Sequence, residues 1–373
     1  MPSTPKHISI LKETRDADRR VILLPDAVRR FVADGFDVAV EAGAGAGLEI
    51  GDHEYRAAGA RIVDTAEAWG SGRYIVKYRY PSEAEWRHFR PDTHLCAWFY
   101  PGETRALTEE LCRRGVTAYT YEFFRTEDGH FPLMAPDSEI SGRLAVLEAA
   151  HLLLNVEGGS GVLLAHVPGA RRARVVVIGH GNAGGAAART AAALGAEVTV
   201  LGRRADALRR FATTMPADVT CELNTPEALE RLVPEADLVV GAILISTYDT
   251  PVMVPPELVA RMRPGSVVVD ITCGYGAGYL PSASTVVRWG KPVPRRHGVA
   301  FVKNDVMPMA VHQSCAEANS VNMTPHLLAL GNAIFDPARP DPVSAAGCFV
   351  AGGRVIHPVI LHDYAVLDGQ AAE

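Results

Sequence analysis

The chain has 373 residues, enough for two domains of ordinary size, and 48% of them are hydrophobic, as in a folded globular protein. The net charge of −6, from 37 Lys and Arg against 43 Asp and Glu, excludes a general basic surface for nucleic acid. No apolar run reaches the roughly 18 residues of a membrane span, and residues 1–10 lack the apolar segment of a signal peptide. Six cysteines without a CxxC pair favour reduced thiols, and the histidines lack ligand spacing. We therefore expect a cytoplasmic protein without a metal site.

In the first 130 residues, short apolar segments alternate with segments of helical spacing. Strands are predicted at 7–11, 38–41, 61–63, 74–78 and 116–119, and helices at 26–34 and 104–114. Such alternation is typical of a parallel sheet with helices on both faces.

A second alternating unit follows a long predicted helix at 138–154. Strands are predicted at 175–178, 197–201, 237–243 and 266–271, and helices at 183–194 and 226–232. A further helix is predicted at 316–333, in the tail that would pack back on the first domain. We expect an α/β protein with two doubly wound Rossmann-like domains and a cleft between them. Residues 1–136 would begin the substrate domain, 137–309 would form the dinucleotide-binding domain, and 310–373 would return to the substrate domain.

A glycine-rich turn lies between the predicted strand at 175–178 and the helix that follows. It has the GxGxxG pattern of a dinucleotide site and consists of Gly179, His180, Gly181, Asn182, Ala183 and Gly184. The first glycine permits the tight turn, the second lets the backbone approach a pyrophosphate, and the third permits close packing of helix on strand. The alternative is a plain tight turn. His180 could touch phosphate, but we favour an imidazole that faces water.

The end of the next strand indicates which dinucleotide binds. An NAD site usually has a carboxylate there for the ribose 2′-hydroxyl, whereas this chain has Gly202, Arg203 and Arg204. Because a guanidinium fork pairs well with phosphate, we expect NADP(H) to be preferred over NAD(H). The alternative is a pair of solvated arginines at a helix start.

Short motifs in order along nearly the whole chain carry a family resemblance. They include Lys12-Glu13-Thr14, Glu41-Ala42-Gly43-Ala44-Gly45, Ala135-Pro136, Gly142-Arg143, Val167-Pro168-Gly169 and Pro264-Gly265. On these the chain resembles a divergent member of the alanine dehydrogenase and pyridine nucleotide transhydrogenase superfamily. It also has some similarity to carboxyethylornithine synthase and saccharopine dehydrogenase. The resemblance implies a homo-oligomeric dehydrogenase acting on C–N bonds, with Arg20 on the substrate carboxylate and Ser138 near the cofactor.

Three positions depart from the catalytic pattern of alanine dehydrogenase. Arg79 stands where the family has a lysine two residues before Pro81, Tyr100 where it has a histidine, and Gly274 where it has an aspartate. These departures argue against alanine and pyruvate as substrates.

The candidate catalytic residues are Lys77, Arg79 and Tyr100. Lys77 and Arg79 lie two apart on a predicted strand, so both would point to one face and make a cationic pocket with Arg20. Tyr100 could donate a hydrogen bond or a proton in place of the histidine. The alternatives are that Lys77 and Arg79 lie on a solvated edge strand, and that Arg20 is a surface arginine beside Arg19. The ring of Tyr100 could equally serve only in packing.

Residues after the later strands complete the predicted cofactor site. They are Ile243, Leu244, Ile271, Thr272, Cys273 and Asn304, with Asp270 as a strand-end residue near the nicotinamide or a simple turn cap.

Three functions compete on these grounds. The first is an NADP(H)-dependent enzyme of amino-acid metabolism that reduces an imine or condenses an amine with a 2-oxo acid. The second is alanine dehydrogenase itself, and the third is an inactive NADP(H)-binding protein. The expected partner is a small amino acid or 2-oxo acid.

Overall fold

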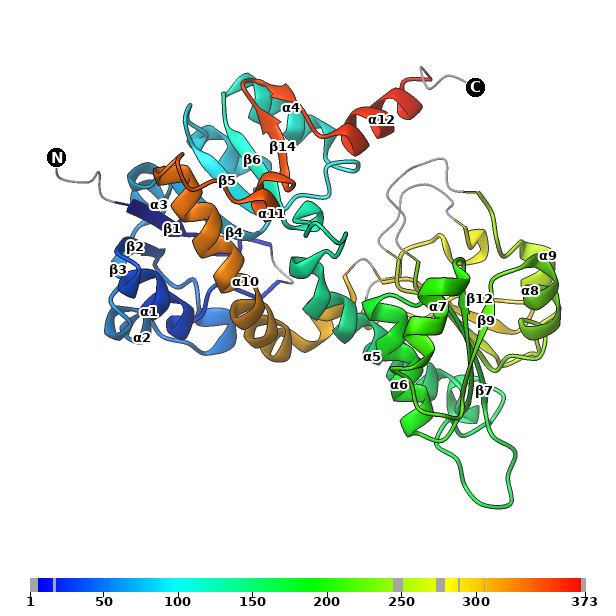
Figure 1. Cartoon of the computed structure of the whole chain (residues 1–373). Coiled ribbons are helices and arrows are strands. Elements are labelled where there is room, and N and C mark those ends of the chain that lie inside the picture. The colour runs from blue at the N-terminus through cyan, green and yellow to red at the C-terminus, as the bar shows by residue number, and fades with distance from the viewer. Residues whose placement is uncertain are drawn as a thin grey trace. The chain divides into compact units, whose positions relative to one another are not determined.

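The computed structural model describes residues 6–15, 18–243, 251–272, 279–287, 289–304 and 306–369. It divides into two compact units, one made of residues 1–136 and 311–373 and the other of residues 137–310 (Figure 1). Each is described by itself.

The first unit is built on an eight-stranded sheet with the order β15-β14-β6-β5-β4-β1-β2-β3. The strands are β1 (Lys6–Ile10), β2 (Phe36–Glu41), β3 (Arg61–Val63), β4 (Tyr74–Arg79), β5 (His94–Trp98), β6 (Thr117–Thr120), β14 (Cys348–Ala351) and β15 (Arg354–Val355). β1 to β6 run parallel to one another. Their carboxyl ends therefore meet at one edge, where α/β sheets place their sites.

Helices connect these strands. They are α1 (Pro25–Ala33), α2 (Asp52–Ala57), α3 (Thr65–Ser71), α4 (Arg105–Arg113), α10 (His312–Phe335), α11 (Pro342–Ala345) and α12 (Pro358–Leu367), with 3-10 turns η1 (Ala46–Leu48), η2 (Glu83–His88), η3 (Tyr121–Phe123), η4 (Pro132–Met134) and η7 (Met307–Val311), which runs up to α10. α1 begins on Pro25, whose fixed φ suits a first helical position. The long α10 includes the predicted tail helix.

The C-terminal segment adds a hairpin that the sequence analysis did not predict. β14 pairs antiparallel with β6, and β15 pairs antiparallel with β14, so the sheet is mixed and not fully parallel as expected (Figure 1). This pairing joins segments more than two hundred residues apart, so no local sequence pattern announces it.

The second unit has a seven-stranded sheet with the order β12-β13-β11-β10-β7-β8-β9. The strands are β7 (Arg174–Ile178), β8 (Glu197–Gly202), β9 (Val219–Leu223), β10 (Leu238–Gly241), β11 (Val267–Asp270), β12 (Arg295–Arg296) and β13 (Val299–Val302). All but β12 run parallel. This is the Rossmann strand order, with one short antiparallel strand at the β13 edge.

Valine-rich runs form the middle of this sheet, as expected for parallel strands covered on both faces. The helices are α5 (Ala135–Leu152), α6 (Asn182–Ala193), α7 (Ala205–Ala212), α8 (Pro226–Leu232) and α9 (Pro256–Val259), with turns η5 (Asn155–Glu157) and η6 (Pro281–Ala283). Gly142 lets α5 approach α6 closely, because a Cβ there would lie 2.1 Å from the carbonyl oxygen of Ala183. No helix in the described part of the chain is long and apolar enough to cross a membrane.

Candidate active site

Lys77, near the carboxyl end of β4, has a fully buried side chain between two carboxylates. Its ammonium group donates to Oε1 of Glu13 at 2.8 Å, and Oε1 of Glu85 lies 3.8 Å away. The second oxygen of Glu13 accepts the backbone N–H of Arg79 at 3.0 Å. The expected cationic pocket is therefore not purely cationic, because two acidic side chains offset the charge of Lys77. The sequence analysis gave neither acid a role.

Arg20 is also enclosed, and its guanidinium group is largely engaged by residues of its own unit. Nε and Nη2 donate to the two oxygens of Asp18 at 2.7 and 2.5 Å, and Nη1 donates to the hydroxyl of Tyr78 at 3.0 Å. Burial alone would raise the pKa of Asp18, but hydrogen bonds and charge from Arg20 lower it below its ordinary value. The bidentate edge predicted to hold a substrate carboxylate thus faces Asp18.

Arg79 and Tyr100 come together with two further aromatic rings. The guanidinium carbon of Arg79 lies 5.6 Å from the ring centroids of both Tyr80 and Tyr100. The ring of Tyr100 stacks on Trp98 at 6.4 Å and meets Tyr80 edge-on at the same distance. Arg15 lies over the ring of Tyr80, with its guanidinium carbon 4.0 Å from the ring centroid. Two arginines and three aromatic rings thus form one group, which we call the Arg79–Tyr100 cluster.

The backbone of Tyr100 has a conformation that bulky residues rarely adopt. Its φ is +48°, and its N–H donates to Oε1 of Glu122 at 2.7 Å. Glu122 also accepts a hydrogen bond from the hydroxyl of Thr120. Burial of the carboxyl group raises the pKa of Glu122 to about 7, against the opposing effect of its backbone hydrogen bonds. Glu122 therefore holds Tyr100 in place and changes charge near neutral pH.

The sequence analysis missed Glu122. It lies in η3, directly after the carboxyl end of β6, the same kind of position that guided the choice of residues in the second unit. The signal was present, but acidic residues after strands are common in turns, and only the structure reveals the bond to Tyr100.

In the second unit, the three glycines of the GxGxxG turn have distinct surroundings. Gly179 has a φ of +112°, and a Cβ there would lie 2.3 Å from the carbonyl oxygen of Ala242. A Cβ on Gly184 would lie 2.0 Å from the carbonyl oxygen of Gly179, whereas nothing lies within 4 Å of one on Gly181. The first and third glycines are thus required by close packing, and the second leaves open space at the start of α6 for an approaching phosphate.

Arg203 and Arg204 follow β8 with exposed side chains, and neither forms an ion pair with any residue that the structure describes. Some other exposed arginines do lie against carboxylates, as Arg61 does with Asp37. The contrast matters because an anion would meet two uncommitted guanidinium groups here. Gly202, the last residue of β8, lies beside the imidazole of His180.

A buried polar group lies at the carboxyl ends of β11 and β13. Lys303 donates to Oδ2 of Asp270 at 2.8 Å, while Oδ1 accepts the N–H of Thr272 at 3.0 Å and the hydroxyl of Tyr279 at 3.3 Å. The hydroxyl of Thr272 donates to the carbonyl oxygen of Ile243 at 3.0 Å. Asp270 is therefore an ion-pair partner and not only a turn cap, and Lys303 was missed.

The remaining predicted residues are placed less closely. Ser138 lies half-buried in the first turns of α5, and Ile271 and Asn304 are half-buried after β11 and β13. Leu244, Cys273 and Gly274 lie outside the described residues. Within the described part of the chain, no group of three or more His, Cys, Asp or Glu side chains could hold a metal ion.

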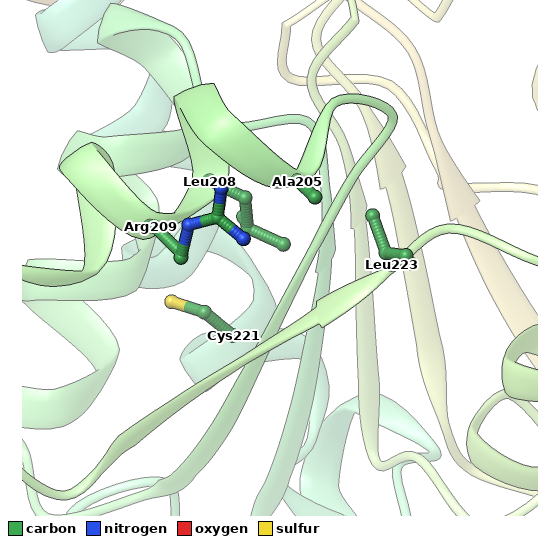
Figure 2. A pocket seen from close by; sticks show the side chains of 5 residues that line it. All are labelled: Ala205, Leu208, Arg209, Cys221 and Leu223. Atoms are coloured by element: carbon green, nitrogen blue, oxygen red, sulfur yellow. The ribbon is translucent and has the colours of Figure 1, made fainter.

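A small pocket of about 190 Å³ lies between α7 and β9 (Figure 2). Its lining side chains are Ala205, Leu208, Arg209, Cys221 and Leu223. It contains none of the GxGxxG residues and has no carboxylate on its walls, so we assign no reaction to it.

A Rossmann sheet with this glycine turn, and a second α/β unit carrying buried cations at its sheet edge, define a pyridine-nucleotide-dependent dehydrogenase. The family models for alanine dehydrogenase/PNT match both parts of the chain, the N-terminal model over residues 9–141 and the C-terminal model over residues 145–358.

Individual relatives agree over nearly the whole length. Alanine dehydrogenase of Mycobacterium tuberculosis H37Rv is 35% identical over 361 residues, covering 96% of this chain and 97% of that protein. Alanine dehydrogenase of Bacillus subtilis is 33% identical over 358 residues, covering 95% and 94%. A solved L-alanine dehydrogenase matches with a TM-score of 0.88 and 33% identity over 97% of this chain and 99% of that one. A transhydrogenase from Sinorhizobium meliloti matches with a TM-score of 0.75 and 25% identity over 94% and 99%.

The chain belongs to the alanine dehydrogenase/PNT family. It is an oxidoreductase of that family, a dehydrogenase acting on CH–NH or CH–NH2 groups with a pyridine nucleotide. The resemblance and the two-domain α/β architecture predicted from the sequence are confirmed, and the inactive binding protein is not supported.

The pKa of Glu122 leads to a test of its role. The carboxyl group is mostly ionised above pH 7 and mostly protonated below it, and only the carboxylate offers full negative charge to the Tyr100 N–H. We expect kcat/KM to fall as the pH drops through about 7, and Glu122→Gln to remove that limb of the profile. Glu83→Gln, which changes an exposed carboxyl group, should retain it. An unchanged limb in Glu122→Gln would assign the titration to another group.

Proposed function

We propose that this enzyme reduces the C=N bond of an imine formed from a 2-oxo acid and either ammonia or an amine. The observation that carries the proposal is the similarity to alanine dehydrogenases over nearly the full length of both domains. A CH–NH2 compound and its 2-oxo acid differ by two electrons, and the imine is the species that accepts them as hydride. A dihydronicotinamide held at the GxGxxG turn would supply that hydride, and the nitrogen, which gains the C=N electron pair, would carry the proton of the protonated imine.

Two choices of nitrogen donor remain, and different observations favour each. The names of the relatives favour ammonia with pyruvate, which would make the enzyme an alanine dehydrogenase. The departures at Arg79, Tyr100 and Gly274 favour a different 2-oxo acid or a primary amine, which would give a secondary amine as product. Both choices use the same carbon–nitrogen chemistry.

An assay of NADPH and NADH oxidation distinguishes these choices. We expect turnover with a 2-oxo acid and a nitrogen donor together, and none with the acid alone. Ammonia with pyruvate as the best pair would establish the alanine dehydrogenase function, and a primary amine as the best donor would establish reductive condensation. Cofactor binding without turnover across a panel of 2-oxo acids and amines would contradict imine reduction.

The Arg79–Tyr100 cluster is our candidate for the substrate groups. We assign the substrate carboxylate to Arg79 in place of Arg20, because the fork of Arg20 is already engaged by Asp18. Arg20 then acts as a positioning residue that fixes Asp18 and Tyr78. Tyr100 is placed to donate a hydrogen bond to the reacting nitrogen or carbonyl oxygen, and Lys77 keeps its neighbours in register through Glu13.

Lysine substitutions separate the roles of the two arginines, because lysine keeps the charge but cannot form a bidentate pair. We expect Arg79→Lys to raise the KM for the acid by about tenfold or more, which corresponds to about 1.4 kcal/mol, with little change in NADPH Kd. Arg20→Lys should mainly lower Tm, because it breaks the buried pair with Asp18. Steady-state kinetics and thermal unfolding provide the readouts. A raised KM in Arg20→Lys at unchanged Tm would return the carboxylate to Arg20, as the family resemblance implies.

We also propose that NADP(H) is preferred over NAD(H). The support is the sequence Gly202-Arg203-Arg204 at the end of β8, where a ribose-binding carboxylate is absent and two exposed guanidinium groups lack ion-pair partners among the described residues. Ser138 and the residues after β10, β11 and β13 are proposed to line the rest of the cofactor site. The cytoplasmic location and the homo-oligomer implied by the resemblance remain proposals for fractionation and light scattering.

The double substitution Arg203→Ala/Arg204→Ala tests this preference. We expect wild-type protein to bind NADPH at least about tenfold more tightly than NADH, since charge-assisted bonds to phosphate contribute that much. The double variant should lose NADPH affinity and keep its NADH affinity. Arg209→Ala/Arg210→Ala, on the next turns of α7, is the matched control and should preserve the preference. Equal Kd values for the two cofactors in calorimetry would contradict the proposal.

A further inference from the structure

The imidazole of His180 lies directly against the end of β8. A Cβ at position 202 would lie 2.7 Å from Nδ1 and 3.0 Å from Cε1 of His180, and 2.8 Å from Cδ1 of Leu208, so the glycine makes room for both side chains. The ring of Phe211 on α7 packs edge-on against it, with 5.6 Å between centroids. The imidazole therefore has a defined place beside the strand and is only half-buried.

The end of β8 is the part of a Rossmann site that contacts the ribose. In a Rossmann site for NAD, the carboxylate at the end of this second strand binds the 2′-hydroxyl. A Cβ at position 202 would contact the imidazole of His180 as well as Leu208. The imidazole thus occupies part of the space that a side chain at position 202 would enter, within the electrostatic influence of Arg204. This position differs from the water-facing imidazole expected from the sequence.

We propose that His180 is a third ligand of the 2′-phosphate, beside Arg203 and Arg204, and that it makes the preference for NADPH over NADH depend on pH. The inference rests on the proposed NADPH preference and adds the residue that modulates it. An imidazolium carries both charge and two N–H donors, whereas a neutral imidazole keeps one donor and can accept from the ribose hydroxyl of NADH.

The surroundings of the ring determine the sign of the effect. Burial, and then the positive charge of Arg204, lower the pKa of His180 below its ordinary value of 6.5, so the free protein holds it neutral at pH 7.5. A bound phosphate would counter Arg204 and favour the imidazolium, so NADPH should take up a proton as it binds. The other charged groups on the elements packed around the ring are Arg203, Asp206, Arg209 and Arg210 before and on α7, and Arg189 on α6.

The linkage predicts that the contribution of His180 to NADPH affinity is full at low pH and is lost as the pH rises through the pKa of the bound state. The phosphate opposes this trend, because its second ionisation near pH 6 adds charge as the pH rises. Wild-type protein must therefore be compared with His180→Gln, which keeps a donor and an acceptor but cannot become charged. His151→Gln, which changes an exposed histidine on α5 of the same unit, is the matched control.

Calorimetry of NADPH and NADH binding at about pH 6 and pH 8 tests the proposal. For each protein, the NADPH Kd at about pH 8 is divided by the Kd at about pH 6. We expect this ratio to be at least about fivefold larger in wild type than in His180→Gln, whereas the corresponding ratio for NADH should be the same in both proteins. Titrations in buffers of different ionisation enthalpy should show proton uptake with NADPH in wild type and His151→Gln, and less in His180→Gln. Identical pH dependence and proton uptake in all three proteins would overturn the role of His180.

A second pair of variants tests the shared space independently of pH. Gly202→Asp alone should weaken both cofactors, because the new side chain meets the imidazole. Adding His180→Ala should restore binding with a preference for NADH, since the carboxylate then meets only the flexible end of Leu208. Equal effects of Gly202→Asp with and without His180→Ala would contradict the shared position. Failure of the underlying NADPH preference has a different signature, namely equal NADPH and NADH Kd in wild type at both pH values.

Discussion

Burial of charge is the constraint on which both candidate sites depend. An ion removed from water without a partner is too costly for a folded protein to keep, and three buried cations of the described chain lie against carboxylates. Lys77 meets Glu13, Arg20 meets Asp18, and Lys303 meets Asp270. These pairs orient side chains near the carboxyl edges of the two sheets. They also decide which cations are already engaged before any substrate or cofactor arrives.

The same residue type therefore has different functions in the two units. Arg20 is enclosed and bound along one whole edge by Asp18, which is the basis of the positioning role that we propose for it. Arg203 and Arg204 are exposed without ion-pair partners among the described residues, so their charge is available to an anion. Arg79 lies among aromatic rings, with its guanidinium carbon 5.6 Å from the ring centroids of both Tyr80 and Tyr100.

Local patterns predicted the parts of the fold that local physics controls. The β7–turn–α6 unit follows from a valine run and three glycines, and α10 follows from helical spacing. The half-exposed edge strand β9 was missed because its pattern is weak, and the β14–β15 hairpin because its pairing with β6 is non-local. Glu13, Glu85, Glu122 and Lys303 were missed for the same reason. Nothing near them in the chain indicates the partner that the fold brings to them.

The position of His180 illustrates how one substitution changes several interactions at once. A glycine at position 202 removes the carboxylate that would repel a phosphate, and it makes room for an imidazole beside the two arginines that follow. The glycine thus accounts both for the absence of the carboxylate and for the space that the imidazole occupies. All of these residues belong to the second unit, while the Arg79–Tyr100 cluster belongs to the first. Under these proposals, cofactor choice and substrate choice reside on separate residues, and a change in one leaves the residues of the other in place.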